Sequence, residues 1–483
     1  MKRSVVVSVS VLSGVLGQAA HAQPDVADLF ADGMVIQADR DAPVWGWAEP
    51  GSRVEVSGSW GESRETTATD AGTWQVELPT PPPGGPFEMT FSDPSGSRTI
   101  GDVLSGEVWI ASGQSNMHMR VRYLRPQYRG VIGRRDAIAT SDDPMLRVLD
   151  VQERVSATPL RETNGTWTKA SPESTGDFSA VAYFFGRALR ERLGVPVGVI
   201  TTDWGGTRAE AWTPLDDLAP FPGVADDVAA VRAMADANET GDKAPAGLNH
   251  NSPAALYHGM IAPLGNFAAR GFVWYQGESN RQNANEYAEL FPTMIGAWRR
   301  DTANPDASFL YVQIAPFRYG KETDDRTAWV RESQRRSLRV PNTAMVVTAD
   351  IGEPRDIHPR QKRAVGDRLA LASLALTYGV EDDSALCPVP RGARRSGEGV
   401  AVAFEHTGGG LVSTQVSPTG FEFRTADGAW HAATAEISVD RVMLQGPGIR
   451  DATEVRYLWS PYHVGTLFDT RSLPASPFVL PIE

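Results

Sequence analysis

The residue types that acyl transfer requires occur at widely separated positions in this sequence. Ser115 stands where a short apolar run, residues 108–111, has given way to small and polar residues. A serine hydroxyl attacks an ester only when a neighbouring base takes its proton. His358 can be that base, and it can later return the proton to the leaving alcohol. The two residues together predict a serine esterase.

The oxyanion of such a reaction needs hydrogen-bond donors that are already in place. We predict three: the backbone N–H of Ser115, a backbone N–H of Gly205 or Gly206, and the side-chain amide of Gln276. Glycine suits the second position because its backbone can approach a substrate with no side chain in the way.

The acid that orients the histidine is left open by the sequence. Asp356 is the first choice, because residues i and i+2 of an extended segment point the same way. The alternatives are Asp350, Glu353 and Glu278, since such a triad is defined by geometry and not by chain order.

An apolar run precedes each segment that carries this chemistry. The runs are residues 108–111, 197–202, 272–275 and 343–348. In a parallel sheet the carboxyl ends of the strands lie at one edge, and ligands bind in the crevice outside them. We therefore expect these distant segments to form one site.

Alternation of strand and helix from about residue 105 to 379 predicts an α/β domain with a parallel sheet covered on both faces. The clearest helix covers about 179–193 and is followed by Gly194. A second helix is expected from Pro359 to about Tyr378.

The flanking segments have a different pattern, with short alternating runs broken by Gly, Pro and Asp, which is typical of β-sandwiches. A chain of 483 residues also exceeds the usual size of a single core. The predicted organisation is an export signal at 1–22, an N-terminal β-sandwich module at 23–103, a catalytic domain at 104–384 and a C-terminal β-rich module at 385–483.

The first residues predict export. A basic start, an apolar run over 5–16 and a small-x-small site at 20–22 are the features of a signal peptide, so we expect a periplasmic or secreted protein. The run is shorter than the ~20 residues that a membrane span needs.

Charge and cysteine content narrow the function further. The net charge of −13 argues against nucleic acid or an anionic membrane as partner. The single cysteine, Cys387, allows neither an intramolecular disulfide nor a thiolate metal cluster. We predict no cofactor and no metal.

The motifs resemble those of a known family, the sialate O-acetylesterase-like branch of the SGNH (GDSL-like) hydrolases, which includes bacterial carbohydrate acetylesterases. The matching segments are MVIQ (34–37), VWGWA (44–48), GQSNM (113–117), DWGGT (203–207), YHGMIAPL (257–264), WYQGESN (274–280), DIHP (356–359) and LPASPF (473–478). The resemblance implies a three-layer αβα flavodoxin-like catalytic domain, no metal, and removal of acetyl groups from sugar hydroxyls.

Matched position by position, the resemblance makes Ser115 the nucleophile, His358 the base, and Gly206 and Gln276 oxyanion donors. The wider superfamily has its acid three residues before the histidine, where this chain has Arg355. The orienting acid therefore stays open.

The expected substrate is an acetylated plant-cell-wall oligosaccharide of the xylan or xyloglucan type, with O-acetylated sialic acids as the alternative. Candidate substrate contacts are Asn116, His118, Trp204, Arg208, Trp212 and Tyr275. A protein of another class, a non-catalytic carbohydrate-binding protein with a degenerate hydrolase domain, would be distinguished by its failure to hydrolyse a small acetyl ester.

Overall fold

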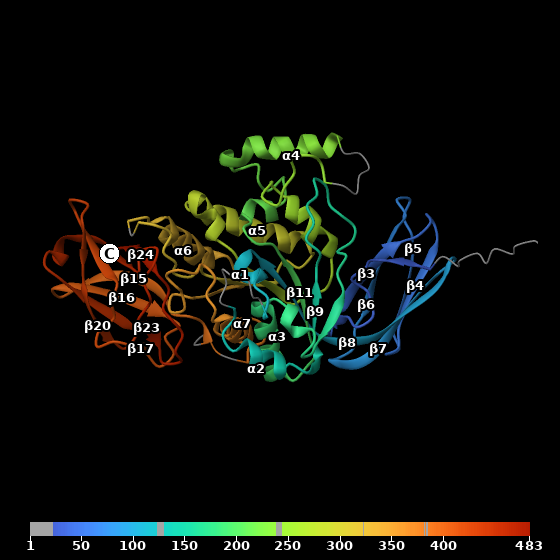
Figure 1. The fold of residues 1–483 in the computed structure, drawn as a ribbon, viewed down its shortest axis with the longest axis horizontal. Helices are drawn as coiled ribbons and strands as arrows, with labels where there is room; N and C mark the ends of the chain where they lie inside the picture. The colour runs from blue at the N-terminus through green and yellow to red at the C-terminus, as the bar shows by residue number, and fades with distance from the viewer. Residues whose placement is uncertain (1–22, 123–129, 238–243, 322, 381, 383–384) are drawn as a thin grey trace, which may run out of the picture.

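The computed structural model describes residues 23–122, 130–237, 244–321, 323–380, 382 and 385–483. An α/β domain lies in the middle, with one β module at each end (Figure 1). The predicted export signal, residues 1–22, falls outside the described residues. Within the described ranges no helix is long and apolar enough to cross a bilayer.

The central domain is built on one large sheet. Its strands are β8 (Gly96–Gly113), β9 (Asp143–Asp150), β10 (Trp167–Ala170), β11 (Val197–Asp203), β12 (Gly271–Tyr275), β13 (Ser308–Val312) and β14 (Thr343–Val346). The order is β10-β9-β11-β8-β12-β13-β14, and all neighbours are parallel except β10 and β9. The strands β11-β8-β12-β13-β14 have the 2-1-3-4-5 order of flavodoxin-like sheets.

Helices cover both faces of this sheet. The helices of the central domain are α1 (Ser115–His118), α2 (Arg134–Ala139), α3 (Ala180–Leu193), α4 (Ala225–Ala237), α5 (Tyr287–Asp301), α6 (Arg326–Arg336) and α7 (Lys362–Leu376), and α4 lies beyond α5, away from the sheet (Figure 1). Helices α3 and α7 pack against each other and share a core with Trp109 and Val273 of one face. The apolar residues of α5 share a core with Phe272 and Trp274, which point to the other face because successive strand residues alternate.

The predicted helix at 179–193 is confirmed, and its ends have the expected chemistry. The Ser179 hydroxyl accepts a hydrogen bond from Ala182 N (3.3 Å), and Gly194 ends the helix with φ +71°. The helix expected from Pro359 to Tyr378 is shorter at both ends, because α7 begins at Lys362 and ends at Leu376.

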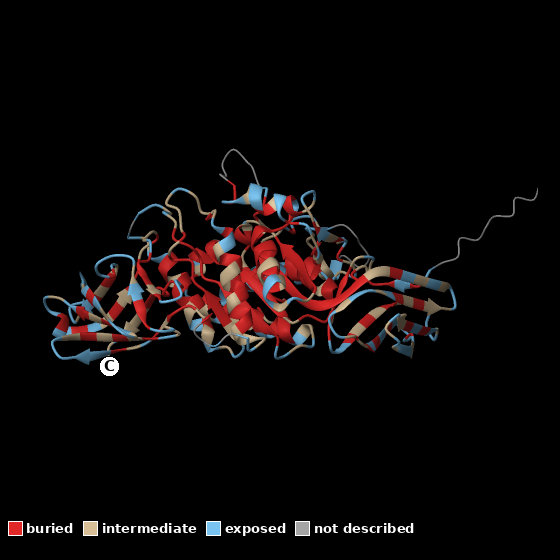
Figure 2. Cartoon of the chain, turned by 90° about the horizontal axis from the view of Figure 1, so that it is seen from below, coloured by how far each residue is buried: buried red, intermediate tan, exposed pale blue. Residues whose placement is uncertain are grey.

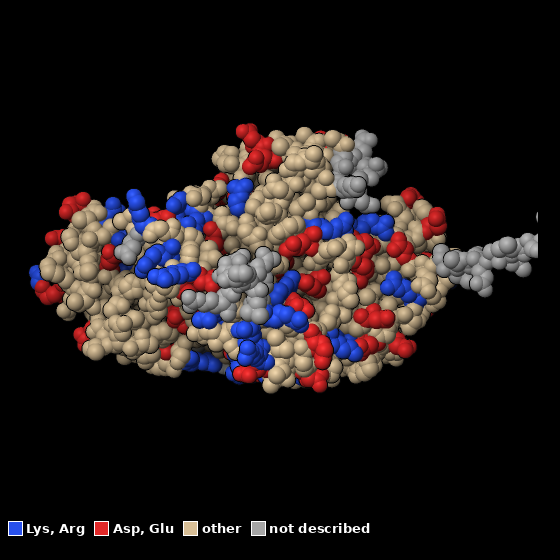
Figure 3. All heavy atoms as spheres, viewed as in Figure 1, with Lys and Arg blue, Asp and Glu red and all other residues tan. Residues whose placement is uncertain are grey.

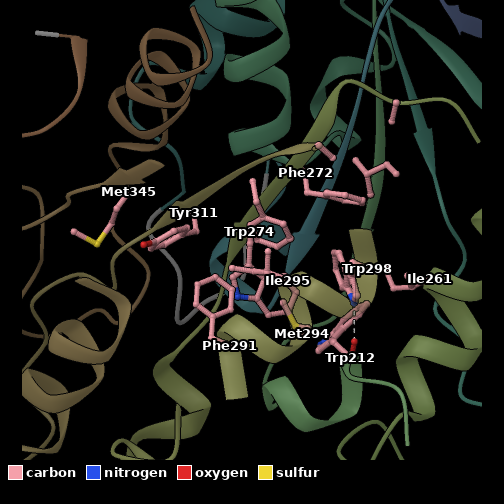
Figure 4. Packing of buried hydrophobic residues seen from close by; sticks show 14 of the residues in the cluster. Trp212, Ile261, Phe272, Trp274, Phe291, Met294, Ile295, Trp298, Tyr311 and Met345 are labelled. Carbon is pink, nitrogen blue, oxygen red and sulfur yellow. Dashed lines mark hydrogen bonds between the residues drawn. The ribbon is translucent and has the colours of Figure 1, made fainter. Parts of the chain in front are cut away.

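Aromatic side chains fill the space between α5 and the sheet (Figure 4). Trp298 of α5 meets Trp274 of β12 edge-on, with ring centroids 5.5 Å apart, and its indole donates to the carbonyl of Trp212 (2.9 Å). Buried residues dominate the central domain, whereas strands of both β modules alternate between buried and exposed residues (Figure 2).

The N-terminal module consists of two sheets, one of which shares the strand β8 with the central domain. The other strands of the module are β1 (Asp25–Val26), β2 (Val35–Gln37), β3 (Asp41–Trp47), β4 (Arg53–Gly58), β5 (Ser63–Thr67), β6 (Thr73–Pro79) and β7 (Gly84–Asp93). The strands β1-β3-β6 form the separate sheet. The first half of β8 pairs with β7 and β2, and its second half pairs with β11 and β12. The boundary predicted at 103/104 thus falls inside one continuous strand.

The C-terminal module is made of antiparallel strands, as the alternating pattern predicts. They are β15 (Val389–Ser396), β16 (Gly399–Glu405), β17 (Leu411–Ser413), β18 (Phe421–Thr425), β19 (Trp430–Ala432), β20 (Thr434–Ser438), β21 (Arg441–Gln445), β22 (Ala452–Tyr457), β23 (Leu467–Asp469) and β24 (Phe478–Pro481). Buried Arg331 of α6 ties this module to the central domain by donating to the carbonyls of Ser460 and Pro461 (3.1 Å each).

The aromatic cluster generates a stability prediction. Trp298→Ala should lower the free energy of unfolding by about 3–5 kcal/mol, because it leaves a cavity that the packed rings cannot fill. Urea denaturation followed by circular dichroism measures this. Val416→Ala, at a fully exposed position, is the control and should change the midpoint little. Equal midpoints for both variants would contradict the role of the cluster.

Candidate active site

A pocket of about 550 Å³ opens at the carboxyl edge of the central sheet. It is lined by Gln114, Ser115, His118, Met119, Glu153, Trp204, Gly205, Gly206, Glu278, Ser279, Ile357 and His358. The parallel pairing of β11, β8 and β12 brings the segments that follow these strands to this edge. The predicted convergence of Ser115, the Gly205-Gly206 segment and His358 is therefore observed.

Ser115 is held at the pocket by the turn between β8 and α1. Gly113 has φ +144°, and a Cβ there would lie 2.2 Å from the carbonyl oxygen of Tyr275, so only glycine fits beside β12. Ser115 is the first residue of α1, where backbone N–H groups have no partner within the helix. Its N–H therefore has no partner within α1 and stays the predicted oxyanion donor.

The loop after β11 supplies the second wall of the pocket. Trp204 N donates to the carbonyl of Gly113 (3.1 Å), which fixes this loop beside the nucleophile turn. Gly206 has φ +78°, a conformation that favours glycine, and a Cβ on Gly205 would already contact Ser115 Cβ at 3.5 Å. Both backbones can therefore approach a group bound at Ser115.

His358 is 7% exposed and lines the pocket. Burial, and next the nearby charge of Lys362, lower its pKa to about 4, so the imidazole is neutral and able to accept a proton near pH 7. Asp356 Oδ1 accepts a hydrogen bond from the backbone N–H of His358 (2.9 Å) and lies 3.5 Å from its Nδ1. Asp356 thus lies beside the ring, at a distance longer than a good hydrogen bond.

Comparisons with known proteins identify the family of the chain. Residues 105–375 match the family described as carbohydrate esterase, sialic acid-specific acetylesterase. The chain belongs to this family. It is therefore a carboxylic ester hydrolase, an acetylesterase, as the sequence motifs predicted.

Individual relatives match over most of their length. Human sialate O-acetylesterase is 31% identical over 408 residues, which cover 75% of this chain and 73% of the human protein. Mouse sialate O-acetylesterase is 29% identical over 405 residues, with 74% of each chain covered. A crystal structure of a carbohydrate acetylesterase from Xanthomonas citri has a TM-score of 0.83 at 35% identity and covers 94% of this chain and 99% of that chain.

Gln276 requires a correction within this acetylesterase. It does not line the pocket and is fully buried. Its Nε2 donates to the carbonyl of Thr207 (3.1 Å) and to Asn280 Oδ1 (2.6 Å), and its Oε1 accepts from the Tyr287 hydroxyl (3.1 Å). Both amide hydrogens are used, so Gln276 shapes the loop after Gly206 and does not have a free N–H for an oxyanion.

Two of the four candidate acids are also corrected. Asp350 forms a two-pronged ion pair with Arg368 (2.8 and 2.6 Å), and Glu353 pairs with Arg360 (2.9 Å). Neither carboxylate lines the pocket. Glu278 does line it, and burial raises the pKa of its carboxyl group.

Asn116, beside the nucleophile, connects several segments of the site through hydrogen bonds of its side-chain amide. It is fully buried, so the expectation that it contacts substrate is wrong. Its Nδ2 donates to Glu278 Oε1 (2.6 Å) and to the carbonyl of Ile357 (3.2 Å), the residue before the base. Its Oδ1 accepts from Lys362 Nζ (2.5 Å). One amide therefore links the nucleophile helix, the histidine loop and two buried ionisable groups.

Lys362 was not found by sequence reasoning, because a lysine four residues after a histidine gives no sign of burial. Here it is fully buried, and burial lowers its pKa to about 7. Its ammonium also lies 5.2 Å from the ring centroid of Tyr275.

His118 lines the pocket as expected and is held by an acid. Its Nδ1 lies 2.7 Å from Asp203 Oδ1 and 3.6 Å from Glu153 Oε1. The hydrogen bond with Asp203 raises the pKa of His118. Glu153 was missed because the β9 strand that leads to it was not recognised in the sequence.

Of the remaining candidate substrate contacts, one lines the pocket and three do not. Trp204 lines the pocket and stacks on His250, with ring centroids 5.5 Å apart. Trp212 and Tyr275 are fully buried core residues, and Arg208 lies outside the pocket, where its backbone N–H donates to Asn251. These three expectations are corrected, because the side chains of neighbouring residues on a strand or turn point in different directions.

The buried lysine generates a pH prediction. Lys362→Met removes a positive charge that disfavours the imidazolium, so the pKa of His358 should rise. Since only neutral His358 accepts a proton, the acidic limb of kcat/KM should move to higher pH by roughly one unit. Its pH profile with p-nitrophenyl acetate measures this.

Two variants serve as controls. Lys362→Arg keeps a charge at the same place and should retain the wild-type limb. Arg363→Met removes an exposed charge one residue further along α7. An acidic limb that is identical in Lys362→Met and Arg363→Met would show that Lys362 does not tune the base.

Proposed function

We propose that this acetylesterase removes O-acetyl groups from plant-cell-wall oligosaccharides of the xylan or xyloglucan type through an acetyl-serine intermediate. The observation that carries the chemistry is the meeting of Ser115, the Gly205-Gly206 backbone and neutral His358 in one pocket. We further infer a periplasmic or secreted location from the apolar segment and cleavage site of residues 1–22. From the order of the motifs we infer an SGNH-type catalytic domain.

The reaction proceeds in two half-reactions. His358 takes the proton of Ser115 Oγ as this oxygen bonds to the acetyl carbonyl carbon. The N–H of Ser115 and the glycine loop hold the oxyanion. Its collapse breaks the bond to the sugar oxygen, which receives the proton from His358. Water then attacks the carbonyl carbon of the acetyl-serine as His358 takes its proton. Collapse of this second intermediate breaks the bond to Ser115 Oγ, which receives the proton from His358, and acetic acid leaves and ionises to acetate.

The pocket wall supports a neutral sugar. Trp204 offers an aromatic surface to a sugar ring. Glu153 and Glu278 line the same pocket, and an acidic sugar would bring a further carboxylate next to them. The Xanthomonas citri relative is described as a carbohydrate acetylesterase.

A second candidate substrate is an O-acetylated sialic acid. The curated mammalian relatives bear the name sialate O-acetylesterase, and this favours it. Acetylated xylo-oligosaccharides, xyloglucan fragments and O-acetyl sialic acids should be compared by mass detection of released acetate. We expect the neutral oligosaccharides to have the higher kcat/KM, and a preference for sialic acids would reverse the choice.

The nucleophile can be tested directly. Ser115→Ala should fold normally and lose at least about a thousandfold in kcat with p-nitrophenyl acetate, because only binding and oxyanion stabilisation remain. Ser95→Ala, at an exposed turn, is the matched control. Activity that persists in Ser115→Ala would remove the serine from the mechanism, and an inactive wild-type protein would favour a non-catalytic carbohydrate-binding role.

Metal independence is a separate prediction. Among the residues that the structure describes, no group of three or more His, Cys, Asp or Glu side chains is arranged to hold a metal ion. Prolonged dialysis against a chelator should leave kcat unchanged, since His358 activates the nucleophile. Activity that falls on dialysis and returns with zinc would contradict the serine mechanism.

A further inference from the structure

A second and larger cleft, of about 950 Å³, lies in the C-terminal module where it meets the central domain. Its floor and walls come from residues 417–422, from β19 and the residues after it, and from residues 456–463 at the end of β22. Thr323 and Asp325 of the central domain complete one side. Neither the nucleophile nor the base lines this cleft.

Trp430, Trp459 and Tyr462 line the cleft, and each ring lies close to an arginine or to another aromatic ring. The guanidinium of Arg456 lies 3.9 Å from the ring centroid of Trp430. Trp459 meets Trp329 of α6 edge-on at 4.9 Å. Tyr462 lies 5.8 Å from the guanidinium of Arg318. Trp430 and Tyr462 are partly exposed, whereas Trp459 is buried, so the first two rings offer apolar surface to the cleft.

Polar groups stand between these rings. Arg456 donates to Glu422 (2.7 Å), which leaves a paired and nearly neutral polar patch on the cleft wall. Thr419 and His463 lie 3.5 Å apart through their side chains, and burial lowers the pKa of His463. A neutral imidazole both donates and accepts hydrogen bonds, as sugar hydroxyls do.

The cleft adjoins the loops that form the carboxyl edge of the central sheet. Phe317 N, after β13, donates to the carbonyl of Pro461 (3.0 Å), and Gly465 N donates to the carbonyl of Ala349 (2.9 Å), after β14. The segment after β14 continues to His358. The C-terminal module that holds the cleft therefore contacts the loops after β13 and β14, and the second of these loops leads to the base.

We propose that this cleft is a glycan-binding site. It would bind neutral, unacetylated sugar residues of the same oligosaccharide whose acetylated residue enters the catalytic pocket. Flat rings alternating with neutral or paired polar groups match the apolar faces and the hydroxyls of pyranose rings. The carboxylate of Asp325 lines the cleft and disfavours an anionic ligand. The inference rests on the proposed function only for the identity of the oligosaccharide that binds.

Binding is measured by calorimetry with Ser115→Ala, which prevents turnover, and with xylohexaose and cellohexaose as probes. We expect one of these to bind and sialyllactose not to bind. In the same background Trp430→Ala should weaken binding at least about tenfold, because a stacking ring is removed. Trp430→Phe should restore part of the affinity. Trp60→Ala, a partly exposed tryptophan of the N-terminal module, is the matched control and should bind as the parent does.

The outcomes separate this inference from the proposed function. Absence of binding by the parent, or equal binding by the parent and Trp430→Ala, overturns the glycan site. A shift from dimer to monomer caused by Trp430→Ala in gel filtration, without glycan binding, would make the cleft a contact between copies of the chain. Hydrolysis of p-nitrophenyl acetate by the wild-type protein is measured alongside, and its failure overturns the esterase alone.

Discussion

The parallel pairing of β8 with β11 and β12 is the constraint on which the site depends. Because the strands run the same way, the turns that follow them must meet at one edge. The close approach of Gly113 to Tyr275 then fixes how the chain leaves β8, and with it the position of Ser115. The strand β8 also continues into one sheet of the N-terminal module, so the two parts share backbone hydrogen bonds along one strand.

Behind the nucleophile the chain keeps charges that are costly to bury. Lys362 and Glu278 are removed from water, and the Asn116 amide between them accepts from one and donates to the other. Desolvation of each ion costs several kcal/mol, which the bridged contacts offset only in part. The arrangement positions the base, because Asn116 donates to the carbonyl of Ile357 next to His358. The charge of Lys362 also lowers the pKa of His358 and so helps to keep the imidazole neutral.

The proposed glycan site and the catalytic pocket would divide the work of binding one oligosaccharide. In this proposal the pocket of about 550 Å³ takes the acetylated sugar residue, and the cleft of about 950 Å³ takes the rest of the oligosaccharide. On the face drawn in Figure 3, acidic and basic side chains are interspersed over the central domain. The expectation that neither nucleic acid nor membrane is a partner stays a prediction.

The sequence by itself determined the chain's periodic elements and the segments that carry its chemistry. Strand periodicity and small residues placed Ser115, Gly205, Gly206 and His358 at strand ends, and a parallel sheet can gather such ends in only one place. Only the tertiary structure decided which neighbouring side chains face the pocket. In the structure Gln276, Trp212 and Tyr275 are buried, and Asp350 and Glu353 pair with arginines. Glu153 lines the pocket, and Lys362 lies buried behind it. Burial and direction depend on packing between distant segments, and local patterns of residue types carry no record of that packing.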